Sequence, residues 1–272
     1  MYQIQLSNAT FEGDNNVYLF DGSETVLVDT GDWMPETREQ LSDALAARGL
    51  GFADIDRLFL THWHGDHIGL AADIQAAGGA TVYIHEDDAP LVAGDPDAWA
   101  RLDELHERRF EHWGMPEYGR KTLRNIFSHS ESREDAPDVT TITDGDSFTV
   151  DGQRFEVVHA PGHAAGLCMY EFGDEVLTGD ALLPQYTPNV GGADVRLEQP
   201  LAKYLETLHA IVDSEYERAW PGHRNVITGP TARAEEIIAH HRERAWRVLD
   251  ALRRLGPADA WTVSADLFGD LE

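Results

Sequence analysis

The sequence predicts a mixed α/β fold that carries a helical insertion and ends in a helical tail, and three observations support this. Short apolar runs alternate with helical spacing through most of residues 1–229. Between about residues 88 and 134 the sequence is charged, contains Trp and His, and gives no strand signal. From residue 230 an amphipathic helical pattern follows. We therefore expect a main domain over residues 1–229, with its insertion at about 88–134, and a C-terminal helical segment over residues 230–272.

The individual elements follow in order along the chain. Two strands are predicted at "NVYLF" and "TVLVDTG", followed by a helix at "ETREQLSDALAARG". The short buried strand "IDRLFL" then precedes a helix that stops at Gly78 and Gly79. Strands return in "FTVDGQRFEVVHA", "GLCMYEFG" and "EVLTGD". One face of the last helix is marked by seven residues: Ile237, Ile238, His241, Ala245, Val248, Leu249 and Leu252.

The stretch "THWHGDH", residues 61–67, concentrates three histidines and an aspartate in seven positions. At the His and Asp frequency of this chain, the pattern HxHxDH should arise by chance in on the order of one in a few hundred chains of this length. The stretch lies between a predicted strand and a predicted helix, so it forms a loop at a strand end. Chance is a poor explanation, and a metal site is the better hypothesis.

The spacing of these side chains divides them into two groups. If the loop stays extended after the strand, His62 and His64 project to the same side and can share one ion. Asp66 and His67, at the turn into the helix, face a neighbouring point and indicate a second ion. Imidazole and carboxylate ligands suit Zn²⁺ first, with Mn²⁺ or Fe²⁺ possible on the same ligand types.

Further candidate ligands follow three other apolar runs. His163 in "HAPGHAAG", Asp180 in "LTGDALLP" and His223 in "WPGHRN" each stand beside Gly or Pro, where a loop leaves a sheet. A single such residue is more often a turn former or a satisfied partly buried group. Four such elements in one chain favour a shared metal centre.

The order of these motifs resembles the metallo-β-lactamase-fold hydrolase superfamily over about residues 10–225. The resemblance implies an αββα sandwich with a dinuclear site along one edge of its two sheets. It also implies that Asp29 in "VDTG" supports the site without binding metal. The implied ligands form two groups and a bridging residue: His62, His64 and His163; Asp66, His67 and His223; and Asp180.

Within the superfamily, the sequence is closer to the glyoxalase II-like and lactamase-like hydrolases than to true β-lactamases. True β-lactamases generally lack the last His of HxHxDH and place Cys where this chain has Asp180. Residues 230–272 resemble the start of a winged-helix-like tail, but the chain ends before a full wing. The glutathione-holding residues of glyoxalase II are not recognisable here.

The resemblance implies a dinuclear hydrolase in which a hydroxide shared by two divalent ions attacks a thioester, phosphodiester or other ester-like substrate. Asp66 would bind metal and orient that hydroxide. A mononuclear iron site like that of persulfide dioxygenases is the alternative, because these enzymes share the motif set but use two histidines and one carboxylate. An endoribonuclease-like activity is a further alternative.

The charge balance restricts the partners. The chain has 49 acidic and 21 basic residues, a formal net charge of −28, with Lys121 and Lys203 as its only lysines. Dispersed acidic charge with arginine in place of lysine favours adaptation to molar salt, which screens self-repulsion. The same charge disfavours nucleic acid without excluding it. No secretion signal and no apolar stretch of membrane-spanning length is present, so we expect a cytoplasmic protein that acts on a small molecule and binds no membrane.

Four other residues have predicted roles. The single cysteine, Cys168, excludes an intrachain disulfide and is expected to be a buried packing residue. Trp33, Trp63 and Tyr186 fall on loops next to candidate ligands and could line a pocket.

Overall fold

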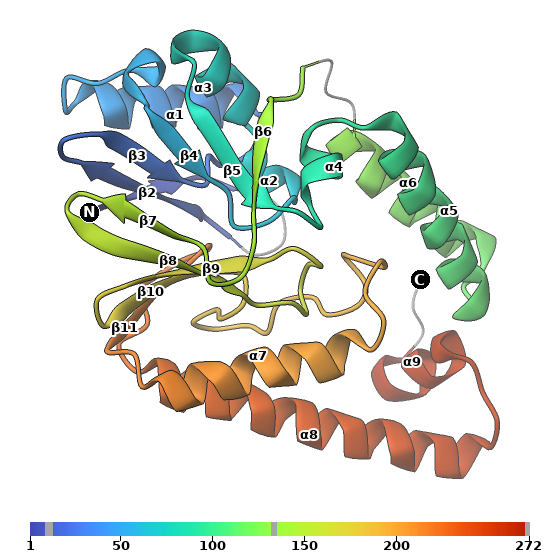
Figure 1. The fold of residues 1–272 in the computed structure, drawn as a ribbon. Coiled ribbons are helices and arrows are strands. Elements are labelled where there is room, and N and C mark those ends of the chain that lie inside the picture. Colours follow the sequence, from blue (N-terminus) through green and yellow to red (C-terminus); the bar gives the residue numbers. More distant parts are fainter. Residues whose placement is uncertain (9–12, 132–134, 270–272) are drawn as a thin grey trace.

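Two mixed sheets stack face to face between two outer layers of helices (Figure 1). The computed structural model describes residues 1–8, 13–131 and 135–269, and the side chains of these residues except those of 125–131. The layer order is helix, sheet, sheet, helix. This arrangement confirms the α/β class and the αββα sandwich that the sequence implies.

The first sheet has six strands in the order β1-β2-β3-β4-β5-β6. The first three pair antiparallel, whereas β3 to β6 run parallel to one another. The parallel strands end at the same edge of the sheet, which is the edge that leads into the "THWHGDH" loop. The strands are β1 Tyr2–Leu6, β2 Asn15–Asp21, β3 Thr25–Val28, β4 Arg57–Phe59, β5 Thr81–His85 and β6 Val139–Ile142.

The second sheet has five strands in the order β11-β10-β9-β8-β7. Strands β7 to β10 pair antiparallel, and β10 and β11 pair parallel. Because β10 and β11 run in parallel, the residues that follow them, Asp180 and His223, leave the sheet at one edge. The strands are β7 Ser147–Val150, β8 Gln153–His159, β9 Cys168–Phe172, β10 Glu175–Gly179 and β11 Arg218–Pro221.

An aromatic core fills the space between the sheets. The ring of Phe59 in the first sheet lies 5.5 Å from that of Tyr170 in the second, and Phe20 packs edge-on against Phe155 at 5.4 Å. These separations are typical of favourable aromatic pairs. Cys168 is buried in the same core, which confirms its predicted packing role.

Helices cover both outer faces of the sandwich. In Figure 1, α1 (Pro35–Ala46) and α3 (Ala71–Gly78) lie over the first sheet, and α7 (Pro200–Ser214) and α8 (Pro230–Leu255) lie over the second. Two short elements, η1 (Phe52–Asp54) and α2 (Gly65–Ile68), connect strands to these helices. Among the described residues, none of the helices is both long and apolar enough to cross a membrane.

Three helices lie within the predicted insertion: α4 (Ala89–Val92), α5 (Pro96–His112) and α6 (Glu117–Glu131). Helix α9 (Ala260–Phe268) reaches them from the C-terminal segment. The amide of Trp261 donates to the carbonyl of Trp113 at 2.9 Å, and the Trp261 and Tyr118 rings pack edge-on at 5.9 Å. The insertion and the tail are therefore in contact, while the domain boundary at residue 229 stays a prediction.

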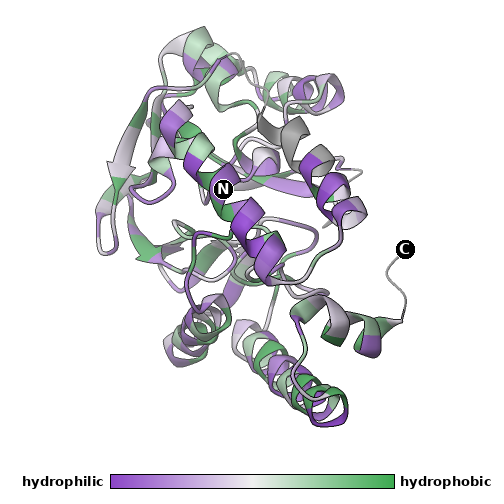
Figure 2. Ribbon diagram, turned by 90° about the vertical axis from the view of Figure 1, so that its right-hand side faces the viewer, coloured by the Kyte–Doolittle hydropathy of each residue, from purple (hydrophilic) through white to green (hydrophobic). Residues whose placement is uncertain are grey.

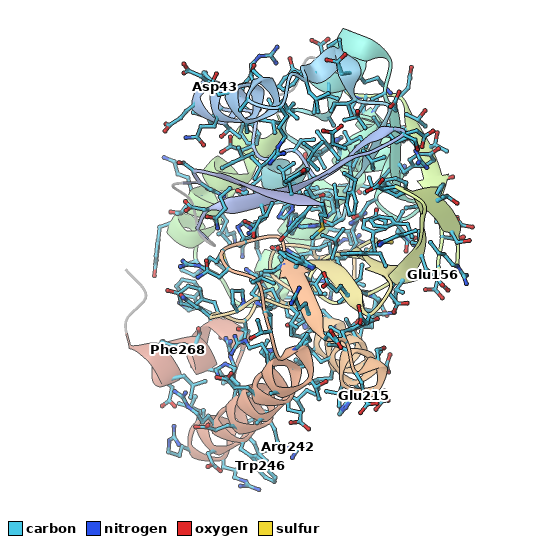
Figure 3. The ribbon with its side chains drawn as sticks, turned by 90° about the vertical axis from the view of Figure 1, so that its left-hand side faces the viewer. Asp43, Glu156, Glu215, Arg242, Trp246 and Phe268 are labelled. Carbon is cyan, nitrogen blue, oxygen red and sulfur yellow. The ribbon has the colours of Figure 1, made fainter. Side chains whose placement is uncertain are left out.

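The predicted apolar face of α8 is only partly covered. Ile237 and His241 are buried, but Ala245 is exposed and Leu249 is 38% exposed. The reason is length: α8 has 26 residues and α7 has 15, so at about 1.5 Å per residue α8 extends well beyond its neighbour. Polar and apolar residues alternate along α8 in Figure 2, and Trp246 points away from the body of the protein in Figure 3.

Candidate metal centre

The loop between β4 and α2 is shaped by Asp29, which follows β3. Its Oδ1 accepts from the Thr61 amide at 2.7 Å, and its Oδ2 accepts from the Thr61 hydroxyl and from His67 Nδ1, both at 2.8 Å. Asp29 adopts a left-handed conformation (φ 60°) to make these contacts. The prediction that Asp29 supports the site is confirmed by these hydrogen bonds.

The first group of candidate ligands consists of three histidines. The Nε2 atoms of His62 and His163 each lie 2.9 Å from Nδ1 of His64. His62 and His163 are buried, and His64 is partly exposed. Thus two loops separated by 99 residues, after β4 and after β8, bring three imidazole nitrogens to one point.

The second group consists of Asp66, His67 and His223. The Nε2 atoms of His67 and His223 lie 3.9 and 3.5 Å from Oδ2 of Asp66. Potential ligand atoms of all three residues lie within 4.8 Å of one another. The same criterion is met by the first group and also by His62, His67 and Asp180, so the two groups adjoin each other and their division between two ions stays a prediction.

Asp180 lies between the two groups. Its Oδ2 is 3.5 Å from Nε2 of both His163 and His223, and its Oδ1 is 3.6 Å from Nε2 of His67. His163 belongs to the first group and the other two histidines to the second. One carboxylate therefore faces both groups, as a bridging ligand would.

Backbone carbonyls on the outer side of the site orient two of the imidazoles. His163 donates from Nδ1 to the carbonyl of Asn189 at 2.8 Å, and His223 donates from Nδ1 to the carbonyl of Gly13 at 2.9 Å. In the neutral form, each of these rings turns an Nε2 lone pair into the site.

Side chains on the outer side of the site orient two more of the imidazoles. His67 donates from Nδ1 to Asp29. The Thr61 hydroxyl gives its single hydrogen to Asp29, so it accepts from His62 Nδ1 at 3.0 Å. These two rings also present Nε2 to the site, so four of the five histidines are held with the same nitrogen facing inward.

Two glycines allow the loops to approach this closely. A Cβ atom on Gly222, which precedes His223, would lie 2.5 Å from Asp180 Oδ1 and 2.7 Å from His67 Cε1. Gly179, which precedes Asp180, has φ +47°, and a Cβ atom there would lie 2.8 Å from Thr61 Cβ. These contacts explain why Gly precedes the ligand residue in "TGD" and in the second "PGH".

The electrostatics of the two groups differ. Burial and the neighbouring histidines hold the pKa of His62 well below its ordinary value and lower that of His64 to about 3. Burial would also lower the pKa of His67, but Asp66, Asp180 and Asp29 outweigh it and raise this pKa to about 10. Burial likewise opposes protonation of His223, and Asp180 raises its pKa.

The chemistry of the donor atoms fits divalent cations. Within the described residues, three buried atoms that face the site have no hydrogen-bond partner: Nε2 of His67 and of His223, and Oδ1 of Asp180. Orphaned buried polar atoms are costly, and imidazole–carboxylate separations of 3.5–3.9 Å are too long for good hydrogen bonds. Cations between these atoms would satisfy them, because neutral imidazole and carboxylate are the ligand types of Zn²⁺ and related metals.

The aromatic residues predicted to line a pocket differ in their positions. Trp63 is 7% exposed and donates from Nε1 to Asp194, so it belongs to the core. Tyr186 is 53% exposed, and Trp33 packs against the position of Gly65 in the ligand loop. The prediction therefore fails for Trp63, because a buried polar partner draws its indole inward.

Two asparagines contribute to the site without having been singled out by the sequence analysis. Nδ2 of Asn15 lies 3.2 Å from Asp66 Oδ2, and Nδ2 of Asn8 lies 3.3 Å from the same oxygen. Both amides orient the carboxylate of Asp66. The available signal for Asn15 is its place at the start of a buried strand, where a polar side chain needs a partner.

A further cluster, His85, Asp87 and His159, lies outside the predicted ligands. The rings of the two histidines stack at 4.1 Å with an interplanar angle of 11°. The lone pairs of parallel rings lie in parallel planes and do not converge on one ion. His159 donates from Nε2 to the carbonyl of Ala165 at 2.8 Å, so this residue braces the loop that carries His163.

Comparison with known sequences places the chain near one family. A sequence model described as the Metallo-beta-lactamase superfamily matches residues 10–223. The beta-lactamase-like protein 2 homolog of Drosophila melanogaster is 27% identical over 89% of this chain and 69% of its own length. Lactamase-like protein notP of an Aspergillus species is 26% identical over 89% of this chain, which spans only 59% of that protein.

A comparison with solved structures agrees with this family match. A metallo-beta-lactamase family protein from Thermus thermophilus superposes with a TM-score of 0.83 at 32% identity, covering 98% of this chain and 87% of its own. TTHA1623, solved in a di-iron-bound form, superposes with a TM-score of 0.56 at 26% identity, covering 84% of this chain and 94% of its own.

Proposed function

Because the chain belongs to the metallo-beta-lactamase superfamily, we propose that it is a dinuclear metal-dependent hydrolase of small ester-like substrates. The observation that carries this proposal is the position of Asp180, whose carboxylate faces His163 in one ligand group and His67 and His223 in the other. A carboxylate between two adjacent clusters is what a pair of ions requires. The orphaned nitrogens around it give the same indication.

When bound, two divalent ions supply Lewis acidity and a water molecule that loses its proton near neutral pH. The protein residues hold and orient the reacting groups. Asp66 is the more accessible carboxylate, with a side chain 31% exposed against 3% for Asp180. Burial would raise its pKa, but His67 and His223 lower it, so Asp66 stays ionised and can orient an attacking water by accepting a hydrogen bond. The two asparagine amides described above hold its Oδ2 for this task.

We propose Zn²⁺ as the first choice of metal, because five imidazoles and two carboxylates match its usual ligands. Mn²⁺ and Fe²⁺ accept the same ligand types. The di-iron form of TTHA1623 supports including iron among the candidates.

The proposed substrates are thioesters, phosphodiesters or other esters of small molecules in the cytoplasm. The lactamase-like names of the relatives support hydrolytic chemistry in general terms. A net charge of −28 disfavours a polyanionic substrate such as RNA, and the chemistry of the site does not require one.

A substrate panel tests this proposal. Apoprotein would be reloaded with Zn²⁺, Mn²⁺ or Fe²⁺ and assayed on thioester, phosphodiester, lactone and RNA substrates in molar KCl. We expect hydrolysis of one small ester-like class, abolished by a chelator and reduced in Asp66→Asn. Asp43→Asn, on the exposed face of α1 (Figure 3), is the matched control. A fully loaded protein that hydrolyses none of these substrates would contradict the proposal.

One observation favours a second candidate, a mononuclear iron dioxygenase. His62, His67 and Asp180 form a buried cluster of two histidines and one carboxylate, the pattern of non-haem iron oxygenases. Oxygen consumption by protein that holds a single iron per chain would support this candidate. Hydrolysis without oxygen uptake, by protein that holds two ions, would exclude it.

A further inference from the structure

A buried ionic cluster lies beside the first ligand group and contains none of the seven candidate ligands. The side chains of Asp88 and Asp194 are fully buried, and that of Arg196 is 18% exposed. Nη2 of Arg196 lies 2.6 Å from Asp88 Oδ1 and also contacts Asp194, while Nε lies 2.9 Å from Asp194 Oδ1. Removing three charges from water is expensive, and apolar residues could pack the same space, so the cluster calls for a role beyond stability.

The two carboxylates hold the loop of the first two histidines. Oδ2 of Asp88 accepts from the amide of Trp63, the residue between His62 and His64, at 3.1 Å. Oδ2 of Asp194 accepts from the indole Nε1 of the same tryptophan at 3.2 Å. Both ends of Trp63 are thereby fixed, and with them the backbone that carries the two ligand side chains.

The same carboxylates hold the loop of the third histidine. Oδ2 of Asp194 accepts from the amide of Ala165 at 2.8 Å, and Oδ1 of Asp88 accepts from the amide of Gly166 at 3.0 Å. A Cβ atom on Gly166 would lie 2.6 Å from Asp88 Cγ, so glycine permits this approach. These residues follow His163 by two and three positions. The cluster therefore joins the two loops whose distance sets the spacing of the three histidines.

Arg196 has the geometry that this junction needs. Its guanidinium reaches both carboxylates, donates from Nη1 to the carbonyl of Asp87 at 2.7 Å, and lies over the Trp63 ring at 5.4 Å. A lysine would keep the charge but not the planar fork. Burial raises the pKa of Asp88 to about 6 even with Arg196 alongside. Without the guanidinium this carboxyl would be more readily protonated and would lose acceptor capacity for the two amides.

The second ligand group has different supports. His67 is held by Asp29, Asp66 by two asparagines, and His223 by the Gly13 carbonyl. The two carboxylates of the ionic cluster take no part in these bonds. A change at Arg196 should thus reach one half of the site and spare the other.

We propose that Arg196 is a positioning residue that sets the geometry and affinity of one ion, the one held by His62, His64 and His163. This inference rests on the proposed dinuclear function. Its distinguishing claim is selectivity: loss of the guanidinium weakens that ion and leaves the ion of the second ligand group in place.

Cobalt titration of the apoprotein tests this claim, because the visible absorption of bound Co²⁺ reports coordination geometry as well as occupancy. The wild type should bind two equivalents. In Arg196→Met we expect one of the two affinities to fall roughly 10-fold, the lower end of the range for partners bonded to the ligands themselves, because the cluster acts through the loop backbone; the spectrum should change for that ion alone. Arg196→Lys should show the same selective loss of affinity to a smaller extent. If Arg196→Met does not fold, the Co²⁺ titration of Arg196→Lys tests the claim in its place.

Two backgrounds identify the affected ion. In His163→Ala, which already lacks a ligand of the first group, Arg196→Met should have no further effect on Co²⁺ binding. In the His223→Ala background, Arg196→Met should lower the Co²⁺ affinity as much as it does in the otherwise wild-type protein. The matched control is Arg57→Met, because the Arg57 side chain is also largely buried, at 14% exposed, and pairs with Glu24 at the other end of β4. The control should leave both affinities unchanged.

Three results would overturn the inference. An Arg196→Met protein with both affinities intact would show that the cluster does not position ligands. An equal loss of both affinities would indicate general destabilisation. Wild-type protein that binds fewer than two equivalents would contradict the proposed function and this inference together, whereas the first two results leave the proposed function standing.

Discussion

The two halves of the metal centre are built from different chemistry. The half formed by His62, His64 and His163 is entirely imidazole, and the ionic cluster around Arg196 joins its loops. The half formed by Asp66, His67 and His223 contains a carboxylate. Its outer contacts run to residues within the first 30 of the chain, namely the side chains of Asn8, Asn15 and Asp29 and the Gly13 carbonyl.

This difference predicts different behaviour before metal arrives. In the imidazole half, burial and mutual repulsion lower the pKa of His62 and His64, so their rings are neutral and ready to coordinate. In the carboxylate half, nearby anions raise the pKa of His67 to about 10, so at neutral pH its ring is protonated on both nitrogens and carries a positive charge. The first half is therefore preorganised for a metal ion, whereas the second half holds the extra proton of His67 where its metal ion would bind.

The largest expected effect comes from Asp180, which both halves share. Asp180→Asn keeps the shape but removes the charge, and an amide oxygen is a poor bridge between ions. We expect loss of at least one ion and a fall in turnover of roughly 100-fold or more. Metal content, melting temperature and turnover would be measured on the same preparation. If Asp180 only capped a turn, the variant would lose about 1 kcal/mol of stability and stay active with full metal content.

Variants that remove a ligand from only one half should lose less metal than Asp180→Asn. His163→Ala and His223→Ala each remove one imidazole from opposite halves, so each should retain about one of the two ions. Elemental analysis after reloading and desalting checks this. The comparison between the halves fails if either variant loses both ions or keeps both.

Salt concentration should change the stability of the whole protein and leave metal binding in both halves unchanged. The Debye length grows from about 3 Å at 1 M to about 10 Å at 0.1 M salt, so repulsion within a chain of net charge −28 increases on dilution. Acidic side chains such as Asp43, Glu156 and Glu215 lie on different parts of the protein in Figure 3. We expect the melting temperature to fall by several degrees at low salt, at unchanged metal content. An unchanged melting temperature would count against salt adaptation.

The smallest effect is proton release on metal binding. His67 has a raised pKa of about 10, so its stabilising contribution to the apoprotein is fully present below about pH 6.5 and is lost as the pH rises through 10. Filling the carboxylate half at pH 8 should therefore release about one proton from His67, and filling the imidazole half almost none. Calorimetric titration of His163→Ala and His223→Ala in two buffers of different ionisation enthalpy measures both values. Equal release from the two variants would refute the electrostatic contrast.

The candidate ligands are predictable from the sequence because their signals are local. The seven residues occupy short segments with Gly or Pro beside them, and His62 and His64 share a side of one loop through simple alternation. The strands leading into the loops of His62 and Asp180, β4 and β10, are largely buried, whereas β8 and β11 also carry exposed polar residues. The layer order follows from the resemblance, since no local pattern specifies how two sheets stack.

The supporting residues could not be predicted in the same way. Asp88 and Arg196 are 108 positions apart, and in an acidic chain neither stands out by composition. The sequence places Trp63 on a loop beside the ligands, but the partner that draws it into the core, Asp194, lies 131 positions away. Helix spacing predicts an apolar face along the whole of α8, yet it cannot show that the neighbouring α7 is shorter.

The central claim is that two adjacent ions occupy one divided site, and the metal content of the protein tests it most directly. Apoprotein reloaded with excess Zn²⁺ and desalted in molar KCl would be analysed by elemental mass spectrometry alongside Asp66→Asn and His223→Ala. We predict about two equivalents per chain for the wild type and about one for each variant. One equivalent in the wild type, unchanged in both variants, would contradict the account.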